Sequence, residues 1–142
     1  MKKNILAVLA VLGLLFACKE YKVVEPISLR ETIQRMWLLK SVAVTENGLP
    51  VRDVTAYNGF TIEFVGEKYF VSNGNEAFPN REGKWGFNDP NFSTIEFDNS
   101  SVIANVTKLN ASELSFTFTR KGSTVNGRIP DRTFTFELIA FR

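Results

Sequence analysis

The sequence contains no histidine and only one cysteine among its 142 residues. Histidine is the commonest general base and the commonest metal ligand in proteins, so its absence removes the most frequent kinds of catalytic triad and zinc site. A single cysteine can form neither an internal disulfide nor a multi-cysteine metal site. These absences exclude most hydrolase triads, zinc enzymes and thiol redox motifs.

The sequence also lacks a surplus of charge of either sign. It has 17 Lys and Arg residues against 15 Asp and Glu residues. Lys2 and Lys3 lie in a segment that we expect to be removed, and no acidic residue precedes position 18, so the rest balances at 17 − 2 = 15 against 15. A neutral domain has no general electrostatic attraction for nucleic acid, and we expect no nucleic-acid partner.

Motifs of catalysis are missing as well. The sequence has no phosphate-binding glycine loop, no nucleophile elbow and no paired carboxylates. Glu63, Glu96 and Glu137 fall on the polar positions of alternating segments, which is typical of solvated surface. We therefore expect no enzymatic activity, no metal and no cofactor. A Ser–Lys pair is the one catalytic arrangement that the residue types leave open.

What the sequence does contain begins with a short basic start and an apolar run from Asn4 to Ala17. The run is shorter than the roughly 20 residues that span a bilayer, and it has the dimensions of the apolar core of a signal peptide. It ends in Leu15-Phe16-Ala17-Cys18, which resembles the lipobox of bacterial lipoproteins. The alternatives are an ordinary secretory signal with a free cysteine, or an uncleaved membrane helix.

The resemblance implies cleavage before Cys18, a diacylglyceryl thioether on its sulfur and an acylated amine. Two or more acyl chains anchor a protein stably to a membrane. The expected organisation is a removed signal peptide over 1–17, a lipidated cysteine and tether over 18–27, and one domain over 28–142. No Asp follows Cys18, so the inner-membrane retention signal of enteric bacteria is missing. We therefore expect the chain to be anchored in the outer membrane, in either the periplasmic or the surface leaflet.

The domain begins with a helix signal. Ser28 and Glu31 have the spacing of a capping box, and Leu29, Ile33 and Met36 follow at the i, i+4, i+7 spacing of one helix face. The pattern predicts a short helix over 28–36.

After Trp37 the apolar period changes to two, and turn sequences separate the runs. Clean alternation indicates strands with one buried and one wet face, as in antiparallel sheets. Strand 102–109 is the least regular, because Ile103 and Leu109 fall out of phase with Val102, Ala104 and Val106. The pattern predicts eight strands, near residues 37–45, 59–65, 68–73, 83–88, 93–98, 102–109, 113–121 and 133–142.

Eight sequential strands of this kind predict an all-β fold, a single antiparallel meander barrel whose closure removes the sheet edges. A two-sheet sandwich is the alternative. In a meander barrel alternate connections share one rim. Because the connections after the first, third and seventh predicted strands are the long ones, we expect them to lie together at one open rim. The helix then plugs the opposite, tight rim, where the last strand also ends, near Trp37.

The short helix, the Trp37-Leu38-Leu39 start of the first strand and the closing Phe134–Arg142 strand together resemble lipocalins. They are most similar to the small lipocalin-like lipoproteins of Bacteroidetes. The resemblance implies that Trp37 packs beneath the barrel with Arg142 stacked across it, as a structural barrel-base pair. The alternative is that Trp37 is simply a core aromatic.

The connection 120–132 carries four cations, Arg120, Lys121, Arg128 and Arg132, and one acid. Aromatic and cationic groups around a barrel mouth can hold an anionic or amphipathic ligand. The alternative is a solvated loop with ordinary charges. The candidate ligand-binding residues are Tyr57, Phe78, Trp85, Arg128 and Arg132.

The many inward rings either fill the barrel or line an aromatic pocket, and the sequence does not choose between these. An eight-stranded barrel is just wide enough for its side chains to fill or for one small ligand. We expect an outer-membrane lipoprotein that binds a small apolar or amphipathic molecule at the open end. The alternative is an accessory protein-interaction module of the cell envelope with a filled barrel.

Overall fold

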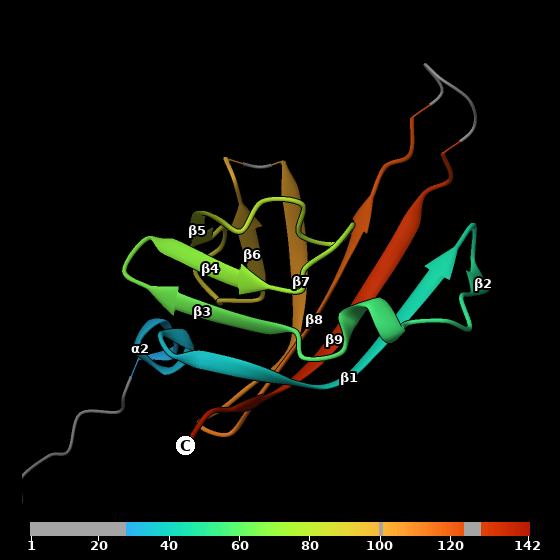
Figure 1. Ribbon diagram of the computed structural model, residues 1–142. Coiled ribbons are helices and arrows are strands. Elements are labelled where there is room, and N and C mark those ends of the chain that lie inside the picture. Colours follow the sequence, from blue (N-terminus) through green and yellow to red (C-terminus); the bar gives the residue numbers. More distant parts are fainter. Residues whose placement is uncertain (1–27, 100, 124–128) are drawn as a thin grey trace, which may run out of the picture.

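The computed structural model describes residues 28–99, 101–123 and 129–142. Over these residues it confirms the predicted fold, a closed antiparallel β-barrel with one short α-helix (Figure 1). The elements are α2 (Leu29–Ile33), β1 (Met36–Glu46), β2 (Leu49–Pro50), a 3-10 turn (Thr55–Tyr57), β3 (Thr61–Val65), β4 (Lys68–Ser72), β5 (Glu82–Phe87), β6 (Thr94–Phe97), β7 (Val102–Leu109), β8 (Glu113–Arg120) and β9 (Arg132–Ala140).

The sheet is a meander that closes on itself. From β3 to β9 each strand pairs with the next, β1 pairs with β3, and β1 and β9 pair from Trp37↔Ala140 to Glu46↔Arg132. The two-residue β2 extends the edge of β1, so eight of the nine strands form the barrel. The sandwich alternative is therefore wrong.

Alternation along the strands decides which side chains fill the barrel. In β8, Leu114, Phe116 and Phe118 are buried, while the residues between them lie on the outer face. There, hydroxyl groups pair across the strands, as between Thr117 and Thr135 at 3.0 Å. The outer face is thus polar and the inner face aromatic, as the period-two pattern predicts.

The irregular strand β7 contains a break in register between Val106 and Lys108, where it pairs with β8. A β-bulge adds one residue to one strand and changes which residues face inward beyond it. Val102 and Ala104 are buried before the break, and Leu109 packs against the core after it. The bulge explains why Leu109 is out of phase in the sequence.

Helix α2 is shorter than predicted. The Ser28 hydroxyl accepts from the Glu31 N–H at 3.2 Å, and the Glu31 carboxylate accepts from the Ser28 N–H at 3.3 Å, so the capping box is formed. Met36, predicted on the helix, instead starts β1 opposite Glu63 of β3. Pairing with β3 therefore ends the helix early.

The side chain of Trp37 caps the other end of α2. Its indole Nε1–H donates to the carbonyl of Ile33 at 2.9 Å, and both residues are fully buried. The same carbonyl also accepts from the backbone N–H of Arg35 at 2.8 Å, so the buried indole N–H finds its partner at the last residue of the helix. No helix among the described residues is long and apolar enough to cross a membrane.

The connections divide between two ends of the barrel. At the helix end lie α2, the connections 66–67, 88–93 and 110–112, and the C-terminus (Figure 1). At the open end lie the connections after β1, β4, β6 and β8. The longest connections share the open end, as the sequence predicts.

Asp89 holds the connection 88–93 together. Its carboxylate accepts from the backbone N–H groups of Asn91 at 2.9 Å, Ser93 at 3.1 Å and Thr94 at 2.7 Å. Hydrogen bonds, chiefly from the Thr94 side chain, hold the pKa of Asp89 well below its ordinary value of 3.8. A carboxyl whose pKa is lower in the folded chain stabilises the fold at pH values above its unfolded pKa.

We expect Asp89→Asn to lower the free energy of unfolding at pH 7, and the deficit to shrink in acid. The carboxylate's contribution is full above the ordinary pKa of 3.8 and is lost as the pH falls through the lower folded value. Urea unfolding of both proteins between pH 7 and pH 2 measures the difference. Glu82→Gln, at an exposed position, is the control. A deficit that does not change with pH contradicts this role.

Candidate functional site at the open end

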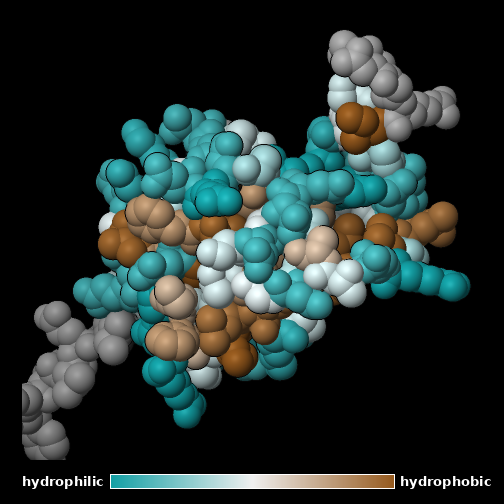
Figure 2. All heavy atoms as spheres, in the orientation of Figure 1, coloured by the Kyte–Doolittle hydropathy of each residue, from teal (hydrophilic) through white to brown (hydrophobic). Residues whose placement is uncertain are grey.

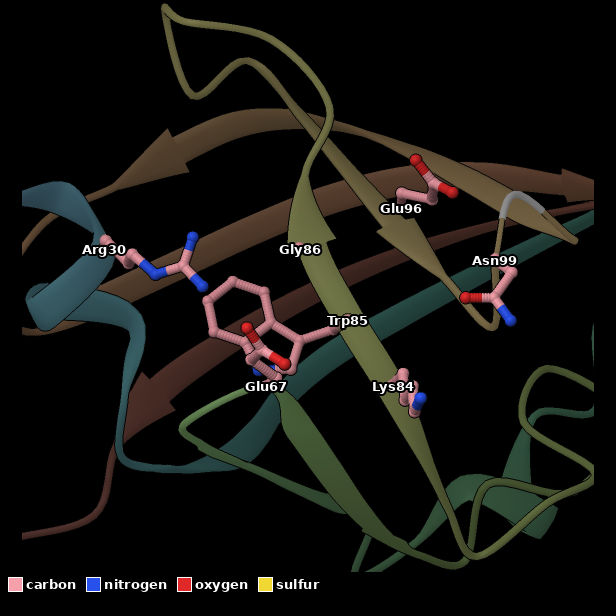
Figure 3. Close-up of a pocket in the computed structure, with 7 residues that line it drawn as sticks. All are labelled: Arg30, Glu67, Lys84, Trp85, Gly86, Glu96 and Asn99. Atoms are coloured by element: carbon pink, nitrogen blue, oxygen red, sulfur yellow. The ribbon is translucent and has the colours of Figure 1, made fainter.

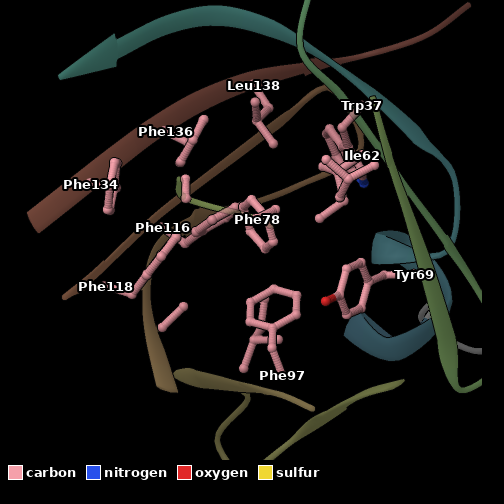
Figure 4. Close-up of a cluster of buried hydrophobic side chains, with 14 of the residues drawn as sticks. Trp37, Ile62, Tyr69, Phe78, Phe97, Phe116, Phe118, Phe134, Phe136 and Leu138 are labelled. Atoms are coloured by element: carbon pink, nitrogen blue, oxygen red, sulfur yellow. The ribbon is translucent and has the colours of Figure 1, made fainter. Parts of the chain in front are cut away.

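The centre of the barrel is filled by Phe78, from the connection 73–81. Its side chain is 3% exposed, and Ala77 beside it is fully buried. The Phe78 N–H donates to the carbonyl of Gly74 at 3.0 Å, which turns the chain inward. Its ring centroid lies 5.3–6.4 Å from six other ring centroids, those of Phe60, Tyr69, Phe97, Phe116, Phe118 and Phe136 (Figure 4). The candidate ligand residue Phe78 is thus a core residue.

A hollow of about 330 Å³ opens above this core at the open end. It forms where β8 and β9 run on together: β8 pairs with β7 as far as Thr117, whereas its pairing with β9 continues to Arg120. The hollow combines an apolar wall with charged groups. It is lined by Glu76, Arg120, Lys121, Ile129, Pro130, Arg132 and Phe134.

Arg132 is committed to structural ion pairs. Its Nε and Nη2 donate to Oε2 of Glu46 at 3.0 and 2.8 Å, and its Nη1 donates to Glu76. The hydrogen bonds to Glu46 and then Glu76 raise the pKa of Arg132 above its ordinary value. The predicted ligand residue Arg132 therefore lines the hollow, with its charge balanced by two carboxylates.

Arg120 differs from Arg132. Its Nε donates to the carbonyl of Ala77 at 2.6 Å, and among the described residues no carboxylate oxygen lies within 4 Å of its guanidinium. The nearby carboxylate of Asp98 instead accepts from the Tyr69 hydroxyl at 2.7 Å. Burial lowers the pKa of Arg120 below its ordinary value. A half-buried cation without an ion pair beside an apolar wall is a suitable contact for an anionic group.

Tyr57 lies beneath the apolar wall of the hollow. Its ring is 6% exposed and meets the rings of Phe134 and Phe136 edge-on, at centroid distances of 6.1 and 5.9 Å. Burial, followed by the charge of Glu76, raises the pKa of Tyr57. Tyr57 thus supports Phe134 from below. The fifth candidate, Arg128, lies outside the described residues.

The structure does not bring Trp85 to this hollow. Trp85 points inward from β5 beside the β3–β4 turn. Its backbone N–H donates to the Glu67 carbonyl in that turn at 3.0 Å. Its ring lies 4.9 Å from that of Phe64 and 5.7 Å from the guanidinium carbon of Arg30 in α2. Trp85 therefore lies at the helix end of the barrel and not at the open end, because its position in β5 places its ring next to α2.

A second hollow, of about 380 Å³, surrounds Trp85 (Figure 3). Its charges are of both signs, and the Trp85 indole N–H is buried without a hydrogen-bond partner among the described residues. Because that N–H is inaccessible, it offers nothing to a ligand in this conformation. The hollow is lined by Arg30, Glu67, Lys84, Trp85, Gly86, Glu96 and Asn99.

The predicted barrel-base residues lie at the helix end. The end of β9 is beside the start of β1, since the Phe141 N–H donates to the Met36 carbonyl at 3.0 Å. The guanidinium carbon of Arg35 lies 5.8 Å from the ring centroid of Trp37. Arg142 is exposed at the same end, and its pairing with Trp37 stays a prediction.

Sequence reasoning missed Glu76 and Phe134 as parts of the hollow, since both lie outside the connection 120–132. Phe134 is recognisable as an inward strand residue, but its place at the mouth follows from how far β9 extends. In the part of the chain that the structure describes, no three potential metal ligands cluster. Neither the models of known protein families nor the curated proteins match this chain.

Proposed function

We propose that this chain is an outer-membrane lipoprotein that binds a small amphipathic molecule with an anionic group in the open-end hollow. The observation that carries the proposal is Arg120, whose half-buried guanidinium adjoins the apolar wall and has no ion-pair partner among the described residues. The anion contacts Arg120, and the apolar part lies against Ile129, Pro130 and Phe134.

The size and depth of the hollow define the ligand further. Its volume of about 330 Å³ falls within the range of small-molecule sites, near the lower limit. Because Phe78 occupies the barrel centre, the ligand rests at the mouth and does not enter the barrel. A short apolar group therefore suits the site better than a long acyl chain.

The proposed membrane anchor is Cys18, within the lipobox-like Leu15–Cys18. A free cysteine after an ordinary signal and an uncleaved helix remain the alternatives. Mass spectrometry of the purified N-terminal peptide separates them, because it gives a diacylated or triacylated Cys18, an unmodified new N-terminus or the intact Met1. Metabolic labelling with palmitate that disappears in Cys18→Ser gives the same answer independently.

The test of ligand binding is native mass spectrometry of protein purified gently from its host, followed by extraction of any bound molecule. We expect a stoichiometric anionic amphiphile. Arg120→Gln is expected to weaken its binding about ten- to hundredfold, because a hydrogen bond to a charged group contributes roughly 1.5–3 kcal/mol. Lys68→Gln, an exposed position of β4, is the control. Equal binding by the Arg120→Gln variant contradicts the site.

A second candidate is an accessory protein-interaction module of the envelope, and the filled barrel favours it. Phe78 removes the interior that ligand-carrying barrels use. This function predicts a clean apo mass for gently purified protein. It also predicts that crosslinkers placed at the open end join one envelope protein in constant stoichiometry.

A further inference from the structure

Exposed apolar side chains occur at the helix end of the barrel. Leu29 on α2 is 37% exposed, Val65 at the end of β3 is 52% exposed, and Ile139 and Phe141 at the end of β9 are 40% and 61% exposed. Figure 2 shows apolar surface at the lower left of the molecule, where β9 ends in Figure 1. These residues come from three separate segments of the chain.

Hydrogen bonds hold the three segments together. The Gly66 N–H in the turn after Val65 donates to Oε1 of Gln34, directly after α2, at 3.0 Å. The Phe141 N–H donates to the Met36 carbonyl at 3.0 Å. The apolar residues are therefore held in fixed places around the segment that links α2 to β1.

The charges of this end are of both signs. Glu113 is ion-paired with both Lys40 and Lys108, and the Glu31 carboxylate takes part in the capping box of α2. The cations around the end are Arg30, Arg35, Lys40, Lys68, Lys108 and Arg142, and the acids are Glu31, Glu67, Asp89 and Glu113. A surface of this kind has apolar attraction for a partner but no strong preference for one sign of charge.

The position of the proposed lipid anchor on Cys18 indicates that the partner of the helix end is the membrane. The described residues begin at Ser28, the N-cap residue of α2, ten residues after Cys18. Ten residues extend at most ~35 Å, so a lipid on Cys18 keeps the helix end close to the bilayer. We propose that the helix end docks on the lipid surface and that the open end faces away from it. This inference depends on the lipidation of Cys18 in the proposed function.

Docking requires the anchor because the apolar surface is small. Four partly exposed side chains give little affinity for a membrane by themselves. The tether converts their contact into an intramolecular event with a high effective concentration. A chain without the acyl groups is therefore expected to stay in solution, while the acylated chain docks. Because the charges at this end are of both signs and partly ion-paired, we expect anionic lipid to change docking little.

The test uses the full acylated chain in phosphatidylcholine vesicles that contain a nitroxide lipid quencher near the headgroups. A single added cysteine, Val65→Cys, Phe141→Cys or Leu49→Cys, carries an environment-sensitive fluorophore. Leu49 is the control, since it is 72% exposed but belongs to the open end. We expect a blue shift and quenching of at least twofold at positions 65 and 141, and no quenching at 49. The same pattern is expected with 30% phosphatidylglycerol.

Flotation of the same vesicles separates the two proposals. If the wild-type chain does not float with the vesicles, the lipid anchor and the docking are both wrong. If it floats but the labels at 65 and 141 stay unquenched, docking alone is wrong. If the label at 49 is quenched instead, the orientation is reversed. Phe141→Ser is expected to keep flotation and to reduce the quenching of the label at 65.

Discussion

Replacing Phe78 with alanine is expected to lower the free energy of unfolding by about 3–5 kcal/mol, the usual cost of deleting a buried phenyl ring. The ring is 3% exposed and lies among six other aromatic rings at the centre of the barrel. The barrel wall is a closed hydrogen-bonded cylinder and cannot collapse far to fill the gap. Urea unfolding followed by circular dichroism measures the loss.

Phe70→Ala is the matched control for this prediction. Phe70 is on the outer face of β4 and is 38% exposed, so the same truncation there leaves no internal cavity. We expect its cost to stay below about 1.5 kcal/mol, because the buried apolar area is much smaller. Equal destabilisation by the two variants is incompatible with Phe78 as the central filling residue.

The role of Phe78 also shows where sequence reasoning stops. In strands such as β8, the alternation of apolar and polar residues identifies the inward-facing side chains. That pattern, together with the turn sequences, predicts the eight strands. The connection 73–81 has no period, and nothing in a single sequence distinguishes an apolar loop residue at a rim from one folded into the barrel. That distinction depends on the volume that the inward strand residues leave unfilled.

The region of the open-end hollow was predictable from the sequence, but the pairing of its charges was not. The cluster of cations in 120–132 identifies the region, and Arg132 does line the hollow. Tertiary contacts decide which of these cations lacks an ion pair. Glu46 and Glu76 both pair with Arg132, and Arg120 has no ion pair among the described residues. Glu46 is 86 residues away from Arg132 in sequence, so local patterns carry no sign of this contact.

Gly83→Ala is expected to lower the free energy of unfolding by about 2–4 kcal/mol, by breaking a partly buried hydrogen-bonded group. Gly83 of β5 faces Tyr69, and a Cβ on Gly83 would collide with Oδ1 of Asp98 and come within 2.7 Å of the Tyr69 ring. That carboxylate accepts from the Tyr69 hydroxyl at 2.7 Å and from the Lys84 N–H at 3.2 Å. A methyl group therefore requires Asp98 to move from both donors.

Gly86→Ala, in the same strand, separates this contact from a general effect of glycine in β5. A Cβ on Gly86 meets no atom within 4 Å, so alanine fits without displacing a neighbour. A compatible Gly→Ala change stabilises a fold by about 0.4–1 kcal/mol, because it restricts the unfolded chain. We therefore expect opposite signs for the two variants in urea unfolding. If both variants are neutral, the carboxylate of Asp98 is free to move, and it does not fix the contact between β5 and the β6–β7 turn.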